Sequence, residues 1–459
     1  MIRSFLADLR LPFFVALCLL FGGASAAGWV ANGMLQLIAI ILMASVLLAF
    51  GAADVIDPDR DTGSVRAPVL FLIVGAFVVW VLLQLIPMPP ALWHLLPARE
   101  PIIEGERLLR MSSGWRPLSM DPEGTLVSLV GLLPAIATLV MAVPSTGRAR
   151  RWTLWVILWI AIASCVFGLV QLQQGETSPS YFYDITNSNT SVGFFSNSNH
   201  FATLMVLAIV LVRPAVSSLF ESRRRRKGSA WLQAGLVALF LTSLLVNGSL
   251  AGYILALPAT LFWISHLPIE GRPWFDRIRD NRVPIFLGGG VLASIGVFAL
   301  RDQLLKLSSG LTDPFLRLHY STETLRTAWD AFPFGTGFGS FRWAYAATQD
   351  PGRIELVYVN HAHNDYAEFL MEGGVIGILF GVALVFWILR AIWRSRALGP
   401  HVMGKIDFAI VAIGLIAAHS LVDYPLRTAG IAAVAAFCLG LLASPDGGRD
   451  WLPKRPSRR

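Results

Sequence analysis

A short polar segment, residues 360–368, concentrates the groups in this chain that are best suited to proton transfer. It reads Asn-His-Ala-His-Asn-Asp-Tyr-Ala-Glu and brings two imidazoles, two carboxylates, two amides and a phenol together beside an apolar run. An imidazole titrates near neutral pH and can take a proton from a hydroxyl group. We therefore interpret His363 as a candidate general base. For His361, both a substrate contact and a purely structural hydrogen bond are open.

Zinc binding is the alternative chemistry for this segment. His361 and His363, with Asp365 or Glu368, could supply ligands of the right type. On a helix, however, residues two positions apart point about 200° away from each other, and no third ligand follows at a standard spacing. The sequence therefore predicts no metal site.

The glycine-rich segment 335–339 raises the possibility of a nucleotide cofactor. It reads Gly-Thr-Gly-Phe-Gly, but it has no preceding strand and lacks the complete G-x-G-x-x-G spacing. We interpret it as a tight turn that lets the chain approach the membrane or a ligand closely, and we expect no cofactor.

A helix is predicted immediately upstream of this turn. Asp313 can cap it, with Pro314 at the first helical position, and it should end near Pro333. Arg317 and Tyr320 are three residues apart and share one face of this helix. The polar face is thus expected to lie at the same level as the histidine segment.

Two further polar segments are expected at that level. Residues 173–199 contain no Lys or Arg and are rich in hydroxyls and amides, including Asn197 and Asn199, which suits them to hydrogen-bond a sugar. The turn from Asp423 to Arg427 carries a carboxylate, a phenol and a guanidinium between the last two apolar runs.

His419 precedes Asp423 by four residues, so we expect both side chains on one helix face. Ionisable groups at membrane depth normally face the protein interior. A structural link between helices therefore remains as open for this pair as a functional role.

The elements that must position these groups are membrane helices. Of the 459 residues, 55% are hydrophobic and 14% are charged, whereas a soluble domain carries about 25% charged residues. Most apolar runs have the length that a helix needs to cross a hydrocarbon core about 30 Å thick. This excludes a single soluble enzyme. The runs predict twelve spans, over 11–27, 34–50, 68–86, 125–143, 153–172, 200–212, 231–246, 251–266, 284–300, 374–393, 406–422 and 428–443.

The positions of the basic residues predict the orientation. Most of the 37 Lys and Arg residues fall in the termini and in the loops on the same side, which places both termini in the cytoplasm. The basic run at 223–227 is then expected to contact the anionic leaflet, and no nucleic-acid partner is expected. The three cysteines lie in apolar runs and indicate no disulfide framework.

One motif adds a family resemblance. His363-Asn364, nine further residues and then Gly374-Val-Ile-Gly377 fit the H-[NSQ]-x9-G-x-x-G pattern of the O-antigen ligase and O-antigen polymerase superfamily, which are bacterial inner-membrane glycosyltransferases. The chain also resembles this family in the segments 193–199 and 332–340, in Arg317 and in the turn at Asp423.

The resemblance implies an all-α, polytopic membrane helix bundle of about twelve transmembrane helices with a large, partly helical periplasmic loop. We divide the chain into transmembrane helices 1–9 (1–300), a periplasmic catalytic loop (301–373), transmembrane helices 10–12 (374–443) and a cytoplasmic tail (444–459).

The implied reaction is a metal-independent, inverting transfer of a glycan from undecaprenyl diphosphate to an acceptor hydroxyl, on lipid A-core or another surface glycan. By this resemblance His363 is the base, Arg317 a diphosphate ligand and Asp423 a supporting acid. Further expected substrate contacts are Asn364, Tyr320, Asn197, Asn199, Arg427 and His361.

The chain departs from the family at one position. Leu250 stands where the family often has an arginine that helps to bind the diphosphate, so Arg427, Arg342 or another outer arginine would have to replace it. Two other functions stay open. One is a polymerase that joins repeat units of O-antigen or exopolysaccharide and uses the same donor chemistry, and the other is a polysaccharide transporter or flippase.

Overall fold

The structure is a computed structural model that describes residues 2–25, 28–51, 66–217, 226–266, 316–349, 352 and 359–444. The span expected over 284–300, the helix start expected at Asp313 and most of the expected tail lie outside these ranges, as does most of the basic run at 223–227.

The described residues form a helix bundle, which confirms the all-α membrane fold. Each expected span within them corresponds to a helix, although the ends differ by several residues. The bundle consists of α1 (Ile2–Phe21), α2 (Trp29–Phe50), α4 (Arg66–Leu83), α7 (Pro122–Gly131) followed by α8 (Leu133–Ala142), α9 (Gly147–Gln174), α10 (Ser198–Ser217), α11 (Arg226–Asn247), α12 (Leu250–Ser265), α17 (Asp365–Ala397), α18 (Pro400–His419) and α19 (Ala429–Ala443).

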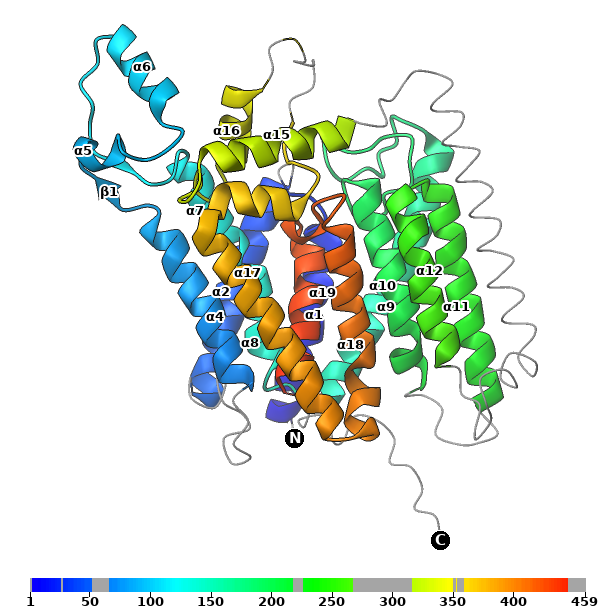
Figure 1. The fold of residues 1–459 in the computed structure, drawn as a ribbon. Coiled ribbons are helices and arrows are strands. Elements are labelled where there is room, and N and C mark those ends of the chain that lie inside the picture. The colour runs from blue at the N-terminus through cyan, green and yellow to red at the C-terminus, as the bar shows by residue number, and fades with distance from the viewer. Residues whose placement is uncertain are drawn as a thin grey trace.

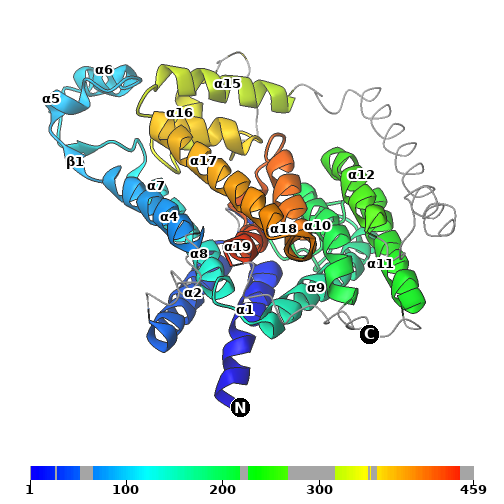
Figure 2. The same cartoon turned by 60° about the horizontal axis from the view of Figure 1, so that its bottom comes forward.

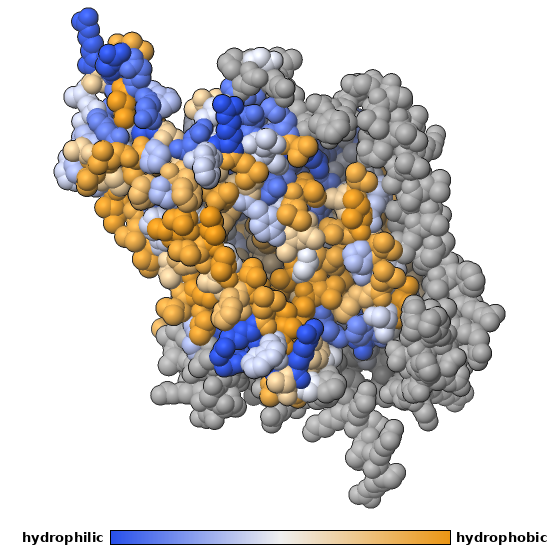
Figure 3. Space-filling model, in the orientation of Figure 1, coloured by the Kyte–Doolittle hydropathy of each residue, from blue (hydrophilic) through white to orange (hydrophobic). Residues whose placement is uncertain are grey.

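The helix lengths and surfaces fit a bilayer. In the described part of the chain, seven helices are long and apolar enough to cross a membrane, and three shorter apolar helices accompany them. Figure 3 shows a broad apolar band around the visible face of the bundle, with polar residues at both of its ends. Exposed leucine and phenylalanine side chains in this band need no protein partner because lipid can cover them.

Two helices form the centre of the bundle. α10 is apolar on all sides, and such a helix is stable only when neighbours surround it. It packs against α9, α11, α12 and α18. α19 is rich in Ala and Gly and lies in the middle of the view in Figure 2, in contact with α1, α8 and α18. Small side chains let these backbones approach closely, as at Gly440 against Ala142.

Several elements lie across one end of the bundle, which we call the site end (Figure 1). α15 (Leu316–Asp330) confirms the predicted helix, and α16 (Phe341–Thr348) follows the glycine turn. A smaller lobe carries α5 (Pro90–Trp93), α6 (Glu100–Leu108) and the antiparallel pair β1 (Pro87–Met88) and β2 (Arg116–Pro117), which the sequence did not indicate. The described N-terminal helix begins at the opposite end of the bundle (Figure 1).

α17 differs from the expected tenth span because it starts at Asp365 and not at Gly374. Asn364 caps it: its side-chain oxygen accepts hydrogen bonds from the amides of Tyr366 and Ala367, at 3.0 and 3.1 Å. The helix is broken at Gly374, where φ is 57° and ψ is −149°. Its first half therefore lies along the site end, and its second half crosses the bundle (Figure 1).

The glycine turn at 335–339 docks against this break. Gly335, Gly337 and Gly339 all have positive φ, which confirms a tight turn. A Cβ atom on Gly335 would lie 2.7 Å from the Glu372 carbonyl oxygen, and one on Gly337 would lie 2.5 Å from the Ser119 hydroxyl. The turn thus approaches other parts of the chain closely, and its expected approach to the membrane or to a ligand stays a prediction.

We predict that Gly374→Ala destabilises the protein. Its backbone conformation is nearly restricted to glycine, and a Cβ atom would overlap the carbonyl of Pro333, which accepts a hydrogen bond from the Val375 amide at 2.8 Å. The cost should be about 2 kcal/mol or more, seen as a lower melting temperature in detergent. Gly377→Ala is the control, because its Cβ would lie 3.4 Å from Phe369, an ordinary contact. Equal melting temperatures for the two variants would contradict this account of the kink.

Candidate active site

A single buried carboxylate organises the site end. Asp423 lies in the turn between α18 and α19 and is 0% exposed. Its oxygens accept hydrogen bonds from the Tyr424 amide, at 2.9 Å, and from the side-chain amide of Asn199. α18 ends at His419, but the Asp423 amide still donates to the His419 carbonyl at 3.0 Å, so Asp423 follows one helical turn after His419, as the spacing predicted. The His419 ring contacts the Thr203 hydroxyl on α10, at 2.7 Å.

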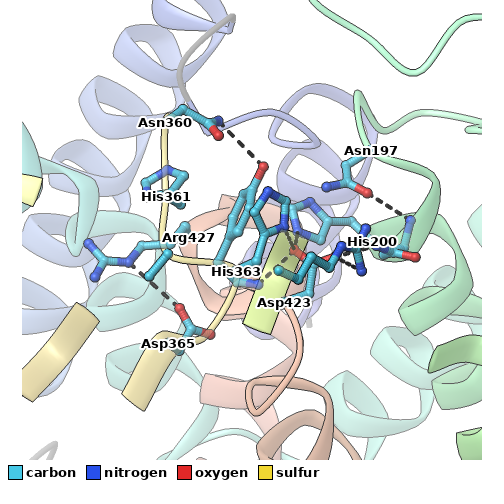
Figure 4. Close-up of polar contacts among 12 residues, drawn as sticks. Asn197, His200, Asn360, His361, His363, Asp365, Asp423 and Arg427 are labelled. Carbon is cyan, nitrogen blue, oxygen red and sulfur yellow. Dashed lines mark hydrogen bonds and ion pairs between the residues drawn. The ribbon is translucent and has the colours of Figure 1, made fainter. Parts of the chain in front are cut away.

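Two histidines and an arginine surround this carboxylate. His363 Nδ1 lies 3.4 Å and His200 Nε2 lies 3.8 Å from Asp423 Oδ1, and Arg317 Nη1 lies 3.9 Å from Oδ2. Figure 4 shows His200 and His363 both directed at Asp423. These groups come from the loop before α17, from α10 and from α15. The structure therefore brings together His363, Arg317 and Asp423, while the chemical roles assigned to them stay predictions.

The charges around Asp423 keep it ionised. Burial alone would raise the pKa of this carboxyl group, but the neighbouring His363, His200 and Arg317 more than offset burial and lower its pKa below the usual range. The carboxylate is therefore a permanent negative charge in the site. It can orient and charge-stabilise an imidazole without itself taking up a proton.

The backbone conformation of the loop before α17 directs the His363 ring towards Asp423. His363 has a positive φ of 50°, which is uncommon for a residue with a side chain. The Asp365 amide donates to the Ser420 carbonyl at 2.9 Å, which ties this loop to the turn that carries Asp423. Tyr320 of α15 stacks on the imidazole at 6.2 Å between ring centroids. The side chain is 19% exposed and its Nδ1 is buried, so its outward edge carries Nε2.

Tyr424 is packed among three imidazoles. Its ring centroid lies 4.4 Å from that of His361, 5.0 Å from His200 and 5.1 Å from His363. Burial and the adjacent Asp423 charge raise the pKa of Tyr424 to about 12, so the phenol stays neutral. His361 and His363 precede α17 and do not lie on it, so the opposed directions expected for a helical His-x-His pair do not apply.

The predicted polar residues of α10 and the loop before it are also at the site. Asn199 is buried, and its amide oxygen accepts a hydrogen bond from the Ser249 hydroxyl at 2.7 Å. Asn197 is partly exposed and accepts a hydrogen bond from the Asn199 amide at 2.8 Å. Ser249 caps α12, which begins at Leu250. The Asn199 side chain therefore connects the cap of α12 to Asp423.

Arg427 lies in a separate cluster. Its guanidinium contacts Glu372 at 3.1 Å, Glu368 at 3.2 Å and Asp365 at 3.7 Å, all on the first half of α17. Burial would lower the pKa of Arg427, but the three carboxylates together raise it above its ordinary value. Figure 4 shows Arg427 and Asp365 apart from the group around Asp423. The described contacts of Arg427 are thus with α17, and a role in binding substrate stays a prediction.

Sequence reasoning missed several residues of the site. His200 begins an apolar run and carried no pattern of its own. Asp365 and Glu368 were considered only as possible metal ligands, and Glu372 was not considered. The three residues are spaced i, i+3, i+7, and this helix-face signal required α17 to be predicted from Asp365. Within the described parts of the chain, no group of three His, Cys, Asp or Glu side chains is arranged to hold a metal ion.

Comparison with known proteins bears on the site directly. Residues 234–382 match the model of a family described as O-antigen ligase. This range contains Arg317 and His363 but ends before Asp423. A search of curated proteins gave no match.

We predict that Arg427→Ala strongly destabilises the fold. The variant leaves Glu368 and Glu372 buried without their guanidinium partner, and breaking such a buried pair costs about 3 kcal/mol or more. Thermal unfolding in detergent should show a large fall in melting temperature. Arg107→Ala is the control: its bond to Glu104 is between side chains that are 75% and 50% exposed, so we expect no measurable change. A normal melting temperature for Arg427→Ala would show that the cluster does not stabilise the fold.

Proposed function

The domain over residues 234–382 makes the chain a member of the O-antigen ligase superfamily, and from this premise we propose that it transfers a glycan from undecaprenyl diphosphate to an acceptor hydroxyl. Membership implies a membrane enzyme of the O-antigen ligase or polymerase type. The proposal adds the lipid diphosphate donor, the acceptor on lipid A-core or another surface glycan, and the residues that carry the reaction.

One observation carries the proposal: an imidazole and a guanidinium lie at the two oxygens of one buried, ionised carboxylate. Because a carboxylate only accepts hydrogen bonds, Asp423 favours the His363 tautomer with its proton on Nδ1. The Nε2 lone pair then faces outward and can take the proton of an acceptor hydroxyl. Asp423 also stabilises the imidazolium that results, as an acid does beside a histidine in hydrolase triads.

Arg317 suits the leaving group. Its side chain is 51% exposed, with Nη1 at 3.9 Å from Asp423, so N–H groups on its exposed side can reach phosphate oxygens. A planar guanidinium matches such oxygens in a bidentate manner and stabilises the charge that develops on them. The bond from the sugar C1 to the diphosphate breaks as the bond to the acceptor oxygen forms. Attack from the opposite side inverts the anomeric centre and requires no metal.

The other expected substrate contacts divide into two groups. Tyr320, Asn197 and His361 are partly exposed around Tyr424 and His363, and we assign them to the substrate surface. Asn199, Asn364 and Arg427 already use their side chains within the protein. We assign these three to holding the site in shape, so their effect on substrate would be indirect.

We propose that the site end faces the periplasm of a bacterial inner membrane and that both termini are cytoplasmic. The distribution of Lys and Arg supports this orientation. The polyprenyl tail would then remain in the bilayer beside the apolar band seen in Figure 3, while the glycan projects over α15 and the polar loop at 175–197.

Replacement of the base or of the cation should abolish transfer. We expect His363→Ala and Arg317→Ala to lose at least 100-fold in rate with purified protein, a lipid-diphosphate-linked oligosaccharide and an acceptor, with product mass as readout. Arg326→Ala is the control for α15 and His94→Ala for histidine loss, because both are exposed and lie away from Asp423. Normal transfer by both site variants would remove the proposed site. Glycan flux across liposomes without any transfer would favour a transporter.

A deletion strain separates ligation from polymerisation. If the chain is a ligase, gels of surface polysaccharide should lack mature glycan while long chains accumulate on the lipid carrier. A single capped repeat on the acceptor would instead show a polymerase. Complementation with His363→Ala should leave either defect uncorrected.

A further inference from the structure

The site end contains a second carboxylate–imidazole pair, to which the function proposed above gives no chemical step. Glu368 is 1% exposed, and its Oε1 lies 2.9 Å from His361 Nδ1. Its Oε2 accepts a hydrogen bond from the Ala362 amide at 3.0 Å. Since the carboxylate only accepts, His361 Nδ1 carries the proton, and Nε2 is the nitrogen on the side away from Glu368. The His361 side chain is 16% exposed.

The two pairs have the same construction. Each carboxylate contacts a partly exposed imidazole and a guanidinium: Asp423 contacts His363 and Arg317, and Glu368 contacts His361 and Arg427. The two imidazoles pack on one phenol ring, that of Tyr424, at 5.1 and 4.4 Å. Both imidazoles are partly exposed at the same end of the bundle, so one ligand at the site end can meet both.

The surrounding charges distinguish the two imidazoles. Asp423 is shared by Arg317 and two histidines. Glu368 belongs to a cluster with Asp365 and Glu372 in which three carboxylates face one arginine. Burial would raise the pKa of Glu368, but Arg427 and His361 lower it to about 2, so an ionised carboxylate lies against the His361 ring.

We propose that His361, held by Glu368, is the group that donates a proton to the leaving diphosphate, while His363 accepts the proton of the acceptor hydroxyl. This inference rests on the proposed function. Glycosyl transfer by direct displacement needs help at both ends of the reacting centre, and two imidazoles about one phenol provide it. Glu368 is a positioning residue, because it acts only through His361.

The step balances in atoms and charge. The C1–oxygen bond to the diphosphate breaks with its electron pair on that oxygen, and the acceptor oxygen forms the new bond to C1. The acceptor proton goes to His363 Nε2, and the His361 Nε2 proton goes to the diphosphate product. Exchange with water then deprotonates His363 and reprotonates His361, which restores the starting state.

A pH profile tests Glu368 in the purified full-length protein. The charged and titratable groups that face His361 are Glu368, Asp365 and Glu372 from α17, Arg427 and Tyr424 from the turn before α19, and His200 from α10. Neutral glutamine at 368 removes the negative partner of His361. Glu368→Gln should therefore move the alkaline limb of the pH profile of the transfer rate to lower pH, by about one unit or more.

Glu372→Gln is the matched control, because Glu372 also contacts Arg427 but does not bond His361. It should lower the rate without an equal shift of the alkaline limb. The inference is overturned if the two variants shift the limb equally or if neither shifts it.

Azide rescue provides a second test. It uses variants of the two histidines, so it remains informative if Glu368→Gln does not fold. Azide needs no base, so it should restore glycosyl transfer, as glycosyl azide, to His363→Ala. It should not restore His361→Ala, in which the leaving group still lacks its proton donor. Equal rescue of both variants, or rescue of His361→Ala alone, would overturn the inference. Absence of any transfer by the wild-type protein would instead refute the proposed function.

Discussion

The buried charge of Asp423 is the constraint on which the site end depends. An ion removed from water is costly unless donors and opposite charges surround it. Here they come from four elements that are distant in the sequence: Asn199 and His200 of α10, Arg317 of α15, His363 before α17 and the backbone of the turn itself. Because each of the four elements contributes a group that contacts the same carboxylate, Asp423 fixes their positions relative to one another.

The second cluster fixes α17 against the same turn. Arg427 follows Asp423 by four residues and holds the three carboxylates on the first half of α17. One of them, Glu372, also accepts the Gly339 amide at 2.8 Å, so the glycine turn is joined to the cluster. The break at Gly374 lets this half-helix lie along the site end while the second half spans the bundle. The loop that carries both histidines therefore joins a half-helix whose position is fixed by Arg427, by the glycine turn and by the break at Gly374.

The sequence predicted the helices well because bilayer thickness sets the length of an apolar run, and this needs no tertiary information. It also predicted α15 and brought His363, Arg317 and Asp423 to one level of the bundle. The start of α17 was not predicted because hydropathy rises only at Gly374, although Asn364 and the acidic residues after it are an ordinary helix start signal. His200 and Ser249 were missed for a different reason. Their roles exist only once α10, α12 and the turn at Asp423 are packed together.

The contacts of Ser249 explain how the chain keeps its structure at Leu250, where the family often has an arginine. Ser249 still caps α12 and still reaches Asp423 through Asn199, so the segment keeps its structural connection to the site while offering no charge at position 250. Arg427 is occupied by α17, so it is poorly placed to supply the missing cation by direct contact. Arg317 is half exposed and shares the Asp423 carboxylate with His363, and His361 contacts the carboxylate of Glu368. Under the proposed function, such a site would neutralise the diphosphate partly with an imidazole, whose charge depends on protonation, whereas the charge of a guanidinium does not.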